Sequence, residues 1–273
     1  MKRNPPVPSG AVPPPPAAGV IVPEELPVAW RGTFCALALL LLVLLWFPVA
    51  RIPAHYTIGM NEGTNAYYEH VVSSGGKVYG HPPKYEYACY PPAFFHLIGW
   101  LSSLTGDINV TGRWLSLLAY LAIAGFASLI VHRLTNSRRL AAYAGLCWLI
   151  WQCAFDPGRV GFNDMHLLGV ALSLAGLYCF VCHPERTRWL CASAVLFALS
   201  LFTKQSPVVF PAAVALQLLQ APRKRLTIWL ATAVAACSIL LLLTLAVDGR
   251  FFLAHLMLPR LYYPADIVNS LSK

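Results

Sequence analysis

The chain has 273 residues, of which 58% are hydrophobic and 11% are charged, and its formal net charge is +9. This small number of charged residues cannot cover the surface of a water-soluble protein of this size. Several apolar runs must therefore face lipid. The composition excludes an ordinary soluble domain and predicts an all-α integral membrane protein. In such a protein the positive charge, which could otherwise suggest nucleic-acid binding, reflects topology and attraction to anionic lipid.

The first 32 residues differ from the rest because they are dense in proline and show neither a helical nor a strand period. This composition predicts a disordered cytosolic tail with polyproline-like character. Lys2 and Arg3 are separated from the first apolar run by the proline segment, which argues against a cleaved signal peptide. The run 33–50 is therefore predicted to remain in the protein as a membrane helix.

Apolar runs of roughly 17 to 25 residues are long enough to cross a bilayer as helices. On that scale residues 33–250 form one polytopic domain with about seven crossings, and residues 251–273 form a tail on the outer face. The three short runs among them borrow flanking residues or are buried among their neighbours. The predicted crossings are 33–50, 114–131, 140–155, 165–182, 189–203, 207–221 and 226–247.

The basic residues predict the orientation, because Lys and Arg in short loops are retained on the cytosolic side. Three basic turns, "HRLTNSRR", "HPERTR" and "APRKR", fall on the same face as Arg31. The other face, predicted to be the outer one, receives the segment 51–113, the loop "FDPGRVGFND" and the turn "TKQS". The protein is thus predicted to be a multi-pass protein of a bacterial inner or plasma membrane with a cytosolic N-terminus.

The outer segment 51–113 is predicted to contain two short helices. "TNAYYEHVVSS" has the pattern of an amphipathic helix closed by Gly75 and Gly76, and residues 91–105 form an apolar helix after a proline pair. The second helix is short for a crossing, so we expect it to lie along the interface or to re-enter from outside. A full crossing there would turn every later basic loop outward.

Two glutamates in the first of these helices are candidate site residues. Glu62 is expected to be partly desolvated beside Tyr67 and Tyr68, which would raise its pKa toward the range useful to a general base. Glu69 lies seven residues later and shares a helical face with Glu62 if the helix starts early. The alternative is that both are solvated loop acids.

Further candidates lie at the outer ends of later crossings. Asp164 needs a partner at a membrane boundary, and Arg159 in the same loop can supply one, although Asp164 could also be a helix N-cap. Lys204, in the break "TKQSP" between two helices, can bind a phosphate as a point charge or can extend to the interface. Arg113 opens a crossing from the outer side. Weaker candidates for contact with phosphate or sugar are Lys77, His81 and Lys84.

The ordered series of these stretches resembles a known family. An apolar first helix is followed by "NEGTNAYYEHVVSSGGKVYG", "YPPAFFHLIGWLSSLTGD", "TGRWLSLLAYLA", "GRVGFNDMHLLGVALSLAGLY" and "LFTKQSPVVFPAAVALQLL". From about residue 33 to 250 this series resembles the N-terminal half of the glycosyltransferase C superfamily. More narrowly, it is similar to bacterial family 39-like enzymes related to protein O-mannosyltransferases and aminoarabinose transferases.

The resemblance implies transfer of a sugar from a polyprenyl-phosphate carrier to an acceptor hydroxyl or amine at the outer face, with inversion at the anomeric carbon. It places the catalytic base at Glu62 in "NEG", where many relatives carry an Asp-Glu or Asp-Gly pair and this chain has Asn61. It also implies substrate contacts for the residues that match its motifs, Arg113, Arg159, Asp164 and Lys204. No cofactor is implied, and with a single loop carboxylate at this point no divalent metal is expected, although some branches require one.

Relatives in this superfamily generally run to about twice this length, which suggests a truncated chain. The alternative function is therefore a non-catalytic or truncated membrane protein of the same fold that binds polyprenyl lipid or needs a partner chain. A small-solute transporter is disfavoured, because no charged residue lies in the middle of a predicted crossing. The sugar and the acceptor are not specified by the sequence.

Overall fold

The computed structural model of the chain describes residues 27–83, 88–183 and 185–258. The regular secondary structure of these residues is entirely helical, which confirms the predicted all-α class. Most of the predicted tail 1–32 lies outside the described residues. The helices are α1 (Pro27–Ala50), α2 (Met60–Ser73), α3 (Ala93–Thr105), α4 (Ile108–Thr135), α5 (Arg138–Phe155), α6 (His166–Cys182), α7 (Thr187–Thr203), the short 3-10 helix η1 (Ser206–Val208), α8 (Val209–Leu219), α9 (Arg223–Val247) and α10 (Phe252–Leu256).

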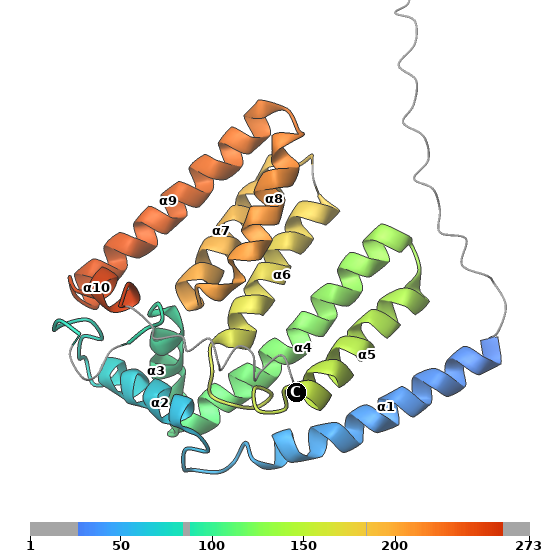
Figure 1. The fold of residues 1–273 in the computed structure, drawn as a ribbon, viewed down its shortest axis with the longest axis horizontal. Helices are drawn as coiled ribbons and strands as arrows, with labels where there is room; N and C mark the ends of the chain where they lie inside the picture. Colours follow the sequence, from blue (N-terminus) through green and yellow to red (C-terminus); the bar gives the residue numbers. More distant parts are fainter. Residues whose placement is uncertain (1–26, 84–87, 184, 259–273) are drawn as a thin grey trace, which may run out of the picture.

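The long helices run side by side and give the molecule two different ends (Figure 1). One end carries α2, α3 and α10 together with the loop before α6 and the junction of α7 with α8; we call it the α2–α3 end. The opposite end carries the three short turns α4–α5, α6–α7 and α8–α9; we call it the turn end. The predicted grouping of loops matches this arrangement, because the basic turns lie together at the turn end.

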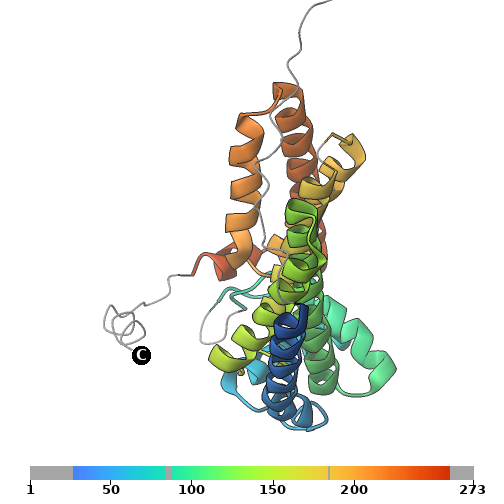
Figure 2. The same ribbon diagram turned by 90° about the vertical axis from the view of Figure 1, so that its right-hand side faces the viewer.

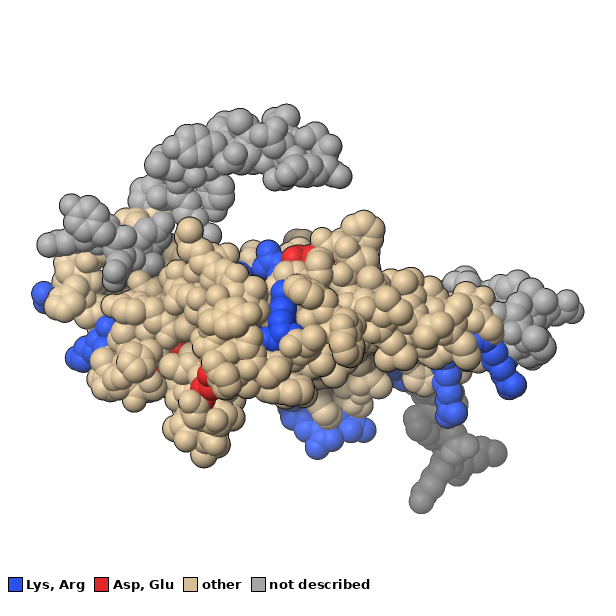
Figure 3. All heavy atoms as spheres, turned by 90° about the horizontal axis from the view of Figure 1, so that it is seen from below, with Lys and Arg blue, Asp and Glu red and all other residues tan. Residues whose placement is uncertain are grey.

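Among the described residues, three helices are long and apolar enough to cross a membrane, namely Trp30–Ala50, Ile108–Thr135 and Arg223–Val247. The helices at four of the other predicted crossings, α5 to α8, are shorter or less apolar, so the count of seven stays a prediction. On the face seen in Figure 3, most of the surface carries no Lys, Arg, Asp or Glu. Exposed apolar side chains such as Leu42, Trp46 and Leu242 suit contact with lipid chains.

Two helix boundaries differ from the prediction. The first helix begins at Pro27, before the predicted start at residue 33, and proline is tolerated there because the first helical N–H needs no partner. Helix α4 begins at Ile108, so Arg113 lies inside a helix and not in the preceding loop. The Asp107 side chain caps this helix by accepting a hydrogen bond from the Val110 N–H at 2.8 Å.

The segment between α1 and α4 folds into the two predicted short helices. Helix α2 starts at Met60, and the chain turns after it through Gly75, whose φ of +76° is in the left-handed region. Helix α3 packs on α2 and buries Phe94, Phe95 and Ile98 between the helices. Figure 2 shows this pair together at the lower part of the molecule. Whether α3 lies along a membrane interface stays a prediction.

The described part of the C-terminal segment is not an isolated tail. Helix α10 packs Phe252 against the buried ring of Tyr79, with ring centroids 5.0 Å apart. At the end of α9, the Asp248 carboxylate accepts a hydrogen bond from His96 of α3 at 2.9 Å. The last helices are therefore joined to the α2–α3 segment at the same end of the molecule.

Candidate functional site

A buried ion pair joins the segment between α1 and α4 to α4. Arg113 donates to both carboxylate oxygens of Glu62, from Nε at 2.8 Å and from Nη2 at 2.7 Å, and neither side chain is exposed. The backbone N–H groups of Ile58 and Asn163 donate to the same carboxylate at 2.7 and 3.0 Å. Both Glu62 oxygens are therefore occupied by four donors.

The other donors of the Arg113 guanidinium bind the segment that leaves α1. They reach backbone carbonyl oxygens of Arg51, Ile52, Ala54 and Tyr56. A fully buried guanidinium needs this many acceptors because an unpaired charge in the interior is costly. Arg113 thus fixes the path of residues 51–56, and its contact with a substrate stays a prediction.

The predicted rise in the pKa of Glu62 is wrong. Burial alone raises its pKa, but the hydrogen bonds from Arg113 and from the two backbone amides outweigh burial and lower it. The prediction rested on desolvation of Glu62 by neighbouring side chains. It did not include the positive charge of Arg113, which lies 51 positions further along the chain. In this conformation Glu62 is a stable anion with no free oxygen.

Glu69 has the properties that the sequence argument assigned to Glu62. It lies on the same face of α2 as Glu62, as their spacing predicted, and both glutamates are fully buried. Burial raises the pKa of Glu69 well above its usual value, and the nearby Glu62 charge raises it further, while one hydrogen bond from the Asn163 side chain, at 2.6 Å, opposes the shift. Burial thus favours the protonated, neutral form of Glu69.

Asn163 connects the two glutamates and was not among the predicted residues. Its backbone N–H donates to Glu62, its side chain donates to Glu69, and its carbonyl oxygen accepts from the Asn65 side chain at 2.7 Å. The only sequence signal for it is its position in "FND", directly before Asp164. This network links the loop before α6 to α2 and α4.

A second polar group lies at the α7–α8 junction. The Lys204 Nζ lies 3.3 Å from the Asp164 carboxylate, and each residue keeps 8% of its surface exposed. The Lys204 ammonium also lies 4.8 Å from the centre of the Tyr90 ring. Burial lowers the pKa of Lys204, and the Asp164 charge partly offsets this. We call Tyr90, Asp164 and Lys204 the junction cluster.

Arg159 does not supply the partner that the sequence predicted for Asp164. Its Nε binds Asp156 at 2.5 Å, three residues earlier in the loop, and both side chains are more than a third exposed. The ion partner of Asp164 comes from Lys204, and Asp164 also accepts a hydrogen bond from the backbone N–H of His166 at 2.6 Å. The latter contact agrees with the alternative prediction that Asp164 caps the start of α6.

An apolar groove of about 520 Å³ begins beside the junction cluster. Gln205 follows Lys204 and lines the groove, and Pro91 follows Tyr90 and lines it as well. Gln205 also donates to the Cys89 carbonyl at 3.0 Å, which joins the two segments. The remaining lining residues are apolar or small and come from α7, η1, α9 and α10: Leu201, Phe202, Val208, Val234, Cys237, Ser238, Leu241, Phe252, Leu253 and Leu256.

The weaker candidates take no part in these clusters. Lys77 and His81 are exposed, and Lys84 lies outside the described residues. In the described part of the chain, His, Cys, Asp and Glu side chains form no group of three that could hold a metal ion. Metal dependence therefore stays a prediction.

The fold and the site together define a helical membrane protein whose two buried ion pairs, Glu62–Arg113 and Asp164–Lys204, lie at the α2–α3 end. Residues 90–249 match the family model described as dolichyl-phosphate-mannose-protein mannosyltransferase. This match covers more than half of the chain, so the chain belongs to that family of glycosyltransferases. The match also confirms the resemblance noted in the sequence. No curated protein and no solved structure matches the chain. Arg113, Arg159, Asp164 and Lys204 lie within the matched residues, whereas Glu62 and Glu69 precede them.

Proposed function

We propose that the protein transfers a sugar from a polyprenyl-phosphate carrier to an acceptor at the α2–α3 end, on the outer face of a bacterial inner or plasma membrane. One observation carries the proposal: Pro91 and Gln205, which line an apolar groove, directly follow Tyr90 and Lys204 of the junction cluster in the chain. A polyprenyl phosphate has the same two parts, a long apolar chain and an anionic head. The chain would occupy the groove, and the phosphate would lie at Lys204.

In the proposed reaction the acceptor oxygen or nitrogen attacks the anomeric carbon, the bond from that carbon to the phosphate oxygen breaks, and the phosphate leaves with the electron pair. Lys204 stabilises the charge on the leaving phosphate. Its ammonium is held in a partly buried setting by Asp164 and Tyr90, where a charge-assisted contact is stronger than in water. Asp164 and the loop that carries Arg159 would contact the sugar.

The acceptor's proton must pass to a base, and the resemblance assigns this role to Glu62. In the described conformation its oxygens are occupied, so proton transfer to Glu62 requires a donor to leave, for example by movement of residues 51–59. Asp164 is a second candidate base because it lies in the junction cluster and retains some exposure. Glu69, whose pKa is raised by burial, would act as a positioning residue through Asn163.

Because both carboxylate oxygens of Glu62 already accept two hydrogen bonds each, the structure also fits the alternative function. This alternative is a membrane protein that binds polyprenyl lipid without transferring sugar, alone or with a partner chain. Under this alternative the groove and Lys204 still bind the carrier, while Glu62 and Arg113 serve only to hold the outer segment. The two functions therefore differ in turnover and not in binding.

A transfer assay distinguishes them. The purified protein in proteoliposomes is given polyprenyl-phosphate mannose and a hydroxyl-bearing acceptor, and release of polyprenyl phosphate is measured for the wild type, Glu62→Gln and Asp164→Asn. Loss of a general base costs roughly 100-fold or more in rate. We expect that loss in Glu62→Gln, assayed well below its lowered unfolding midpoint, with carrier binding nearly intact. Such a loss in Asp164→Asn alone would identify Asp164 as the general base. If the wild type binds the carrier but releases no polyprenyl phosphate, the non-catalytic alternative is supported.

A further inference from the structure

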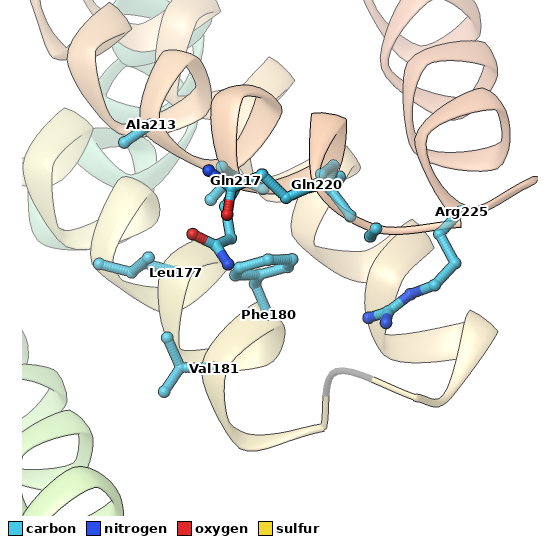
Figure 4. A pocket seen from close by; sticks show the side chains of 10 residues that line it. Leu177, Phe180, Val181, Ala213, Gln217, Gln220 and Arg225 are labelled. Carbon is cyan, nitrogen blue, oxygen red and sulfur yellow. The ribbon is translucent and has the colours of Figure 1, made fainter. Parts of the chain in front are cut away.

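A second groove lies at the turn end, far from the junction cluster. It has a volume of about 470 Å³ and lies between α6 and α8 (Figure 4). Val214 and Leu218, each 1% exposed, belong to its floor and to the core cluster beneath it. The floor is thus part of the packed interior. Its other apolar lining comes from Leu177, Phe180, Val181, Ala213 and Ala221.

Polar side chains converge on this apolar groove. Gln217 extends from α8 toward Phe180, and Gln220 and Arg225 lie at the end where α8 turns into α9 (Figure 4). Gln217 is the only polar residue in the sequence of α8, "VFPAAVALQLL", and a glutamine on a lipid-facing helix is unfavourable unless it meets polar groups. An apolar cleft with a few convergent polar groups is the usual form of a ligand site.

We infer that this groove binds an anionic phospholipid, with an acyl chain along Leu177 and Val214 and the phosphate at Arg225. Charge supports this occupant, because Arg223 and Lys224 adjoin Arg225 and add a positive field at the level of the head groups. The inference concerns a different end of the molecule from the sugar-transfer site and does not depend on it.

One acidic group faces the proposed head-group position. The Glu185 carboxylate lies 3.2 Å from Arg225 Nη1, and Glu185 is 82% exposed in its side chain while Arg225 is 22% exposed. A guanidinium has five N–H donors and can bind a phosphate oxygen while it keeps a carboxylate contact. Glu185 would therefore weaken phosphate binding without preventing it, and its removal should tighten binding.

Native mass spectrometry of the full chain in detergent, titrated with palmitoyl-oleoyl phosphatidylglycerol or phosphatidylcholine, tests the inference. We expect phosphatidylglycerol to bind at least about tenfold more tightly than phosphatidylcholine, and Arg225→Gln to remove about tenfold of that affinity. Arg223→Gln, at an exposed position outside the groove lining, is the matched control and should change affinity by less than about twofold. Glu185→Gln should tighten binding.

A second variant tests where the acyl chain binds. Ala213 is exposed and lines the groove, so Ala213→Trp fills the groove without entering the core. We expect it to reduce phosphatidylglycerol binding at an unchanged thermal unfolding midpoint, whereas inorganic phosphate at the same concentration should not displace the lipid. The double variant Asp164→Asn/Lys204→Gln should retain this binding. Equal losses in Arg223→Gln and Arg225→Gln, displacement by inorganic phosphate, or full binding by folded Ala213→Trp would each overturn the inference.

Discussion

The Arg113 guanidinium and the Glu62 carboxylate form a doubly hydrogen-bonded ion pair in which neither side chain is exposed to solvent. The pair joins α4 to the start of α2, and the other Arg113 donors bind the chain that connects α1 to α2. Arg113 is therefore one of several attachments of the segment between α1 and α4 to the rest of the molecule, together with the bonds of Asn163 to Glu62 and Glu69 and of His96 to Asp248.

Removing one partner of this pair should destabilise the protein strongly. Glu62→Gln leaves the buried Arg113 charge without a counter-ion, which costs about 3–5 kcal/mol. The corresponding fall in the thermal unfolding midpoint is about 10 °C. The double variant Glu62→Gln/Arg113→Met should lose less than the sum of the two single variants. Additive losses in this double-mutant cycle, followed by thermal unfolding in detergent, would show that the pair is not coupled.

Glu69 should make stability depend on pH. Its pKa is raised in the folded state, so the folded protein binds a proton that the unfolded chain releases above its ordinary pKa of about 4.5. The contribution of Glu69 to the free energy of unfolding is fully present at pH values below 4.5, and it is lost as the pH rises through the pKa of the folded state. We expect Glu69→Gln, which is neutral at every pH, to match the wild type near pH 4 and to exceed it in unfolding midpoint at pH 8. Parallel curves for the two proteins between these pH values would contradict a neutral Glu69.

Gly112 should be intolerant of any side chain. A Cβ at this position would lie 1.9 Å from Asn163 Oδ1. Gly112→Ala must therefore displace Asn163 from its contacts with Glu62 and Glu69, at a cost of roughly 1–3 kcal/mol or more. Gly125→Ala in the same helix meets no atom within 4 Å and should be neutral or stabilising. Equal unfolding midpoints for the two variants would show that Asn163 is not packed against α4.

Patterns within one segment allowed much of this fold to be predicted. The apolar runs located the long helices, and the spacing of Glu62 and Glu69 placed both on one face of α2. The early start of α4 also had a local signal, since Asp107 is a favourable N-cap residue, but the prediction began the crossing at the apolar run instead.

The partners within the site could not be predicted from such patterns. Glu62 and Arg113 are 51 positions apart, and Asp164 and Lys204 are 40 positions apart. These contacts depend on how neighbouring helices are rotated and displaced along one another, which periodicity does not determine. For the same reason the sequence paired Asp164 with the near Arg159 rather than with Lys204, and it assigned a raised pKa to Glu62 rather than to Glu69.

The orientation in the membrane is predicted by charge and can be measured directly. We expect Ser74→Cys, at an exposed position after α2, to react with a membrane-impermeant maleimide from outside intact cells, because the basic turns are retained in the cytosol. Arg138→Cys in the α4–α5 turn should react only after permeabilisation, and the unsubstituted chain serves as the control for its own cysteines. Reaction of both positions from the same side would contradict the assignment of the α2–α3 end to the outer face.

The central claim is that the junction cluster and its groove bind a polyprenyl phosphate, and the affinity of the purified protein for that lipid tests it most directly. Asp164→Asn/Lys204→Gln removes the cation without leaving an unpaired carboxylate, and Lys77→Gln removes an exposed cation of the same outer segment. The account predicts that the double variant binds polyprenyl phosphate about tenfold or more weakly than the wild type, because a charge-assisted phosphate contact is lost. It predicts little change for Lys77→Gln. Wild-type affinity in the double variant, or an equal loss in both variants, would contradict it.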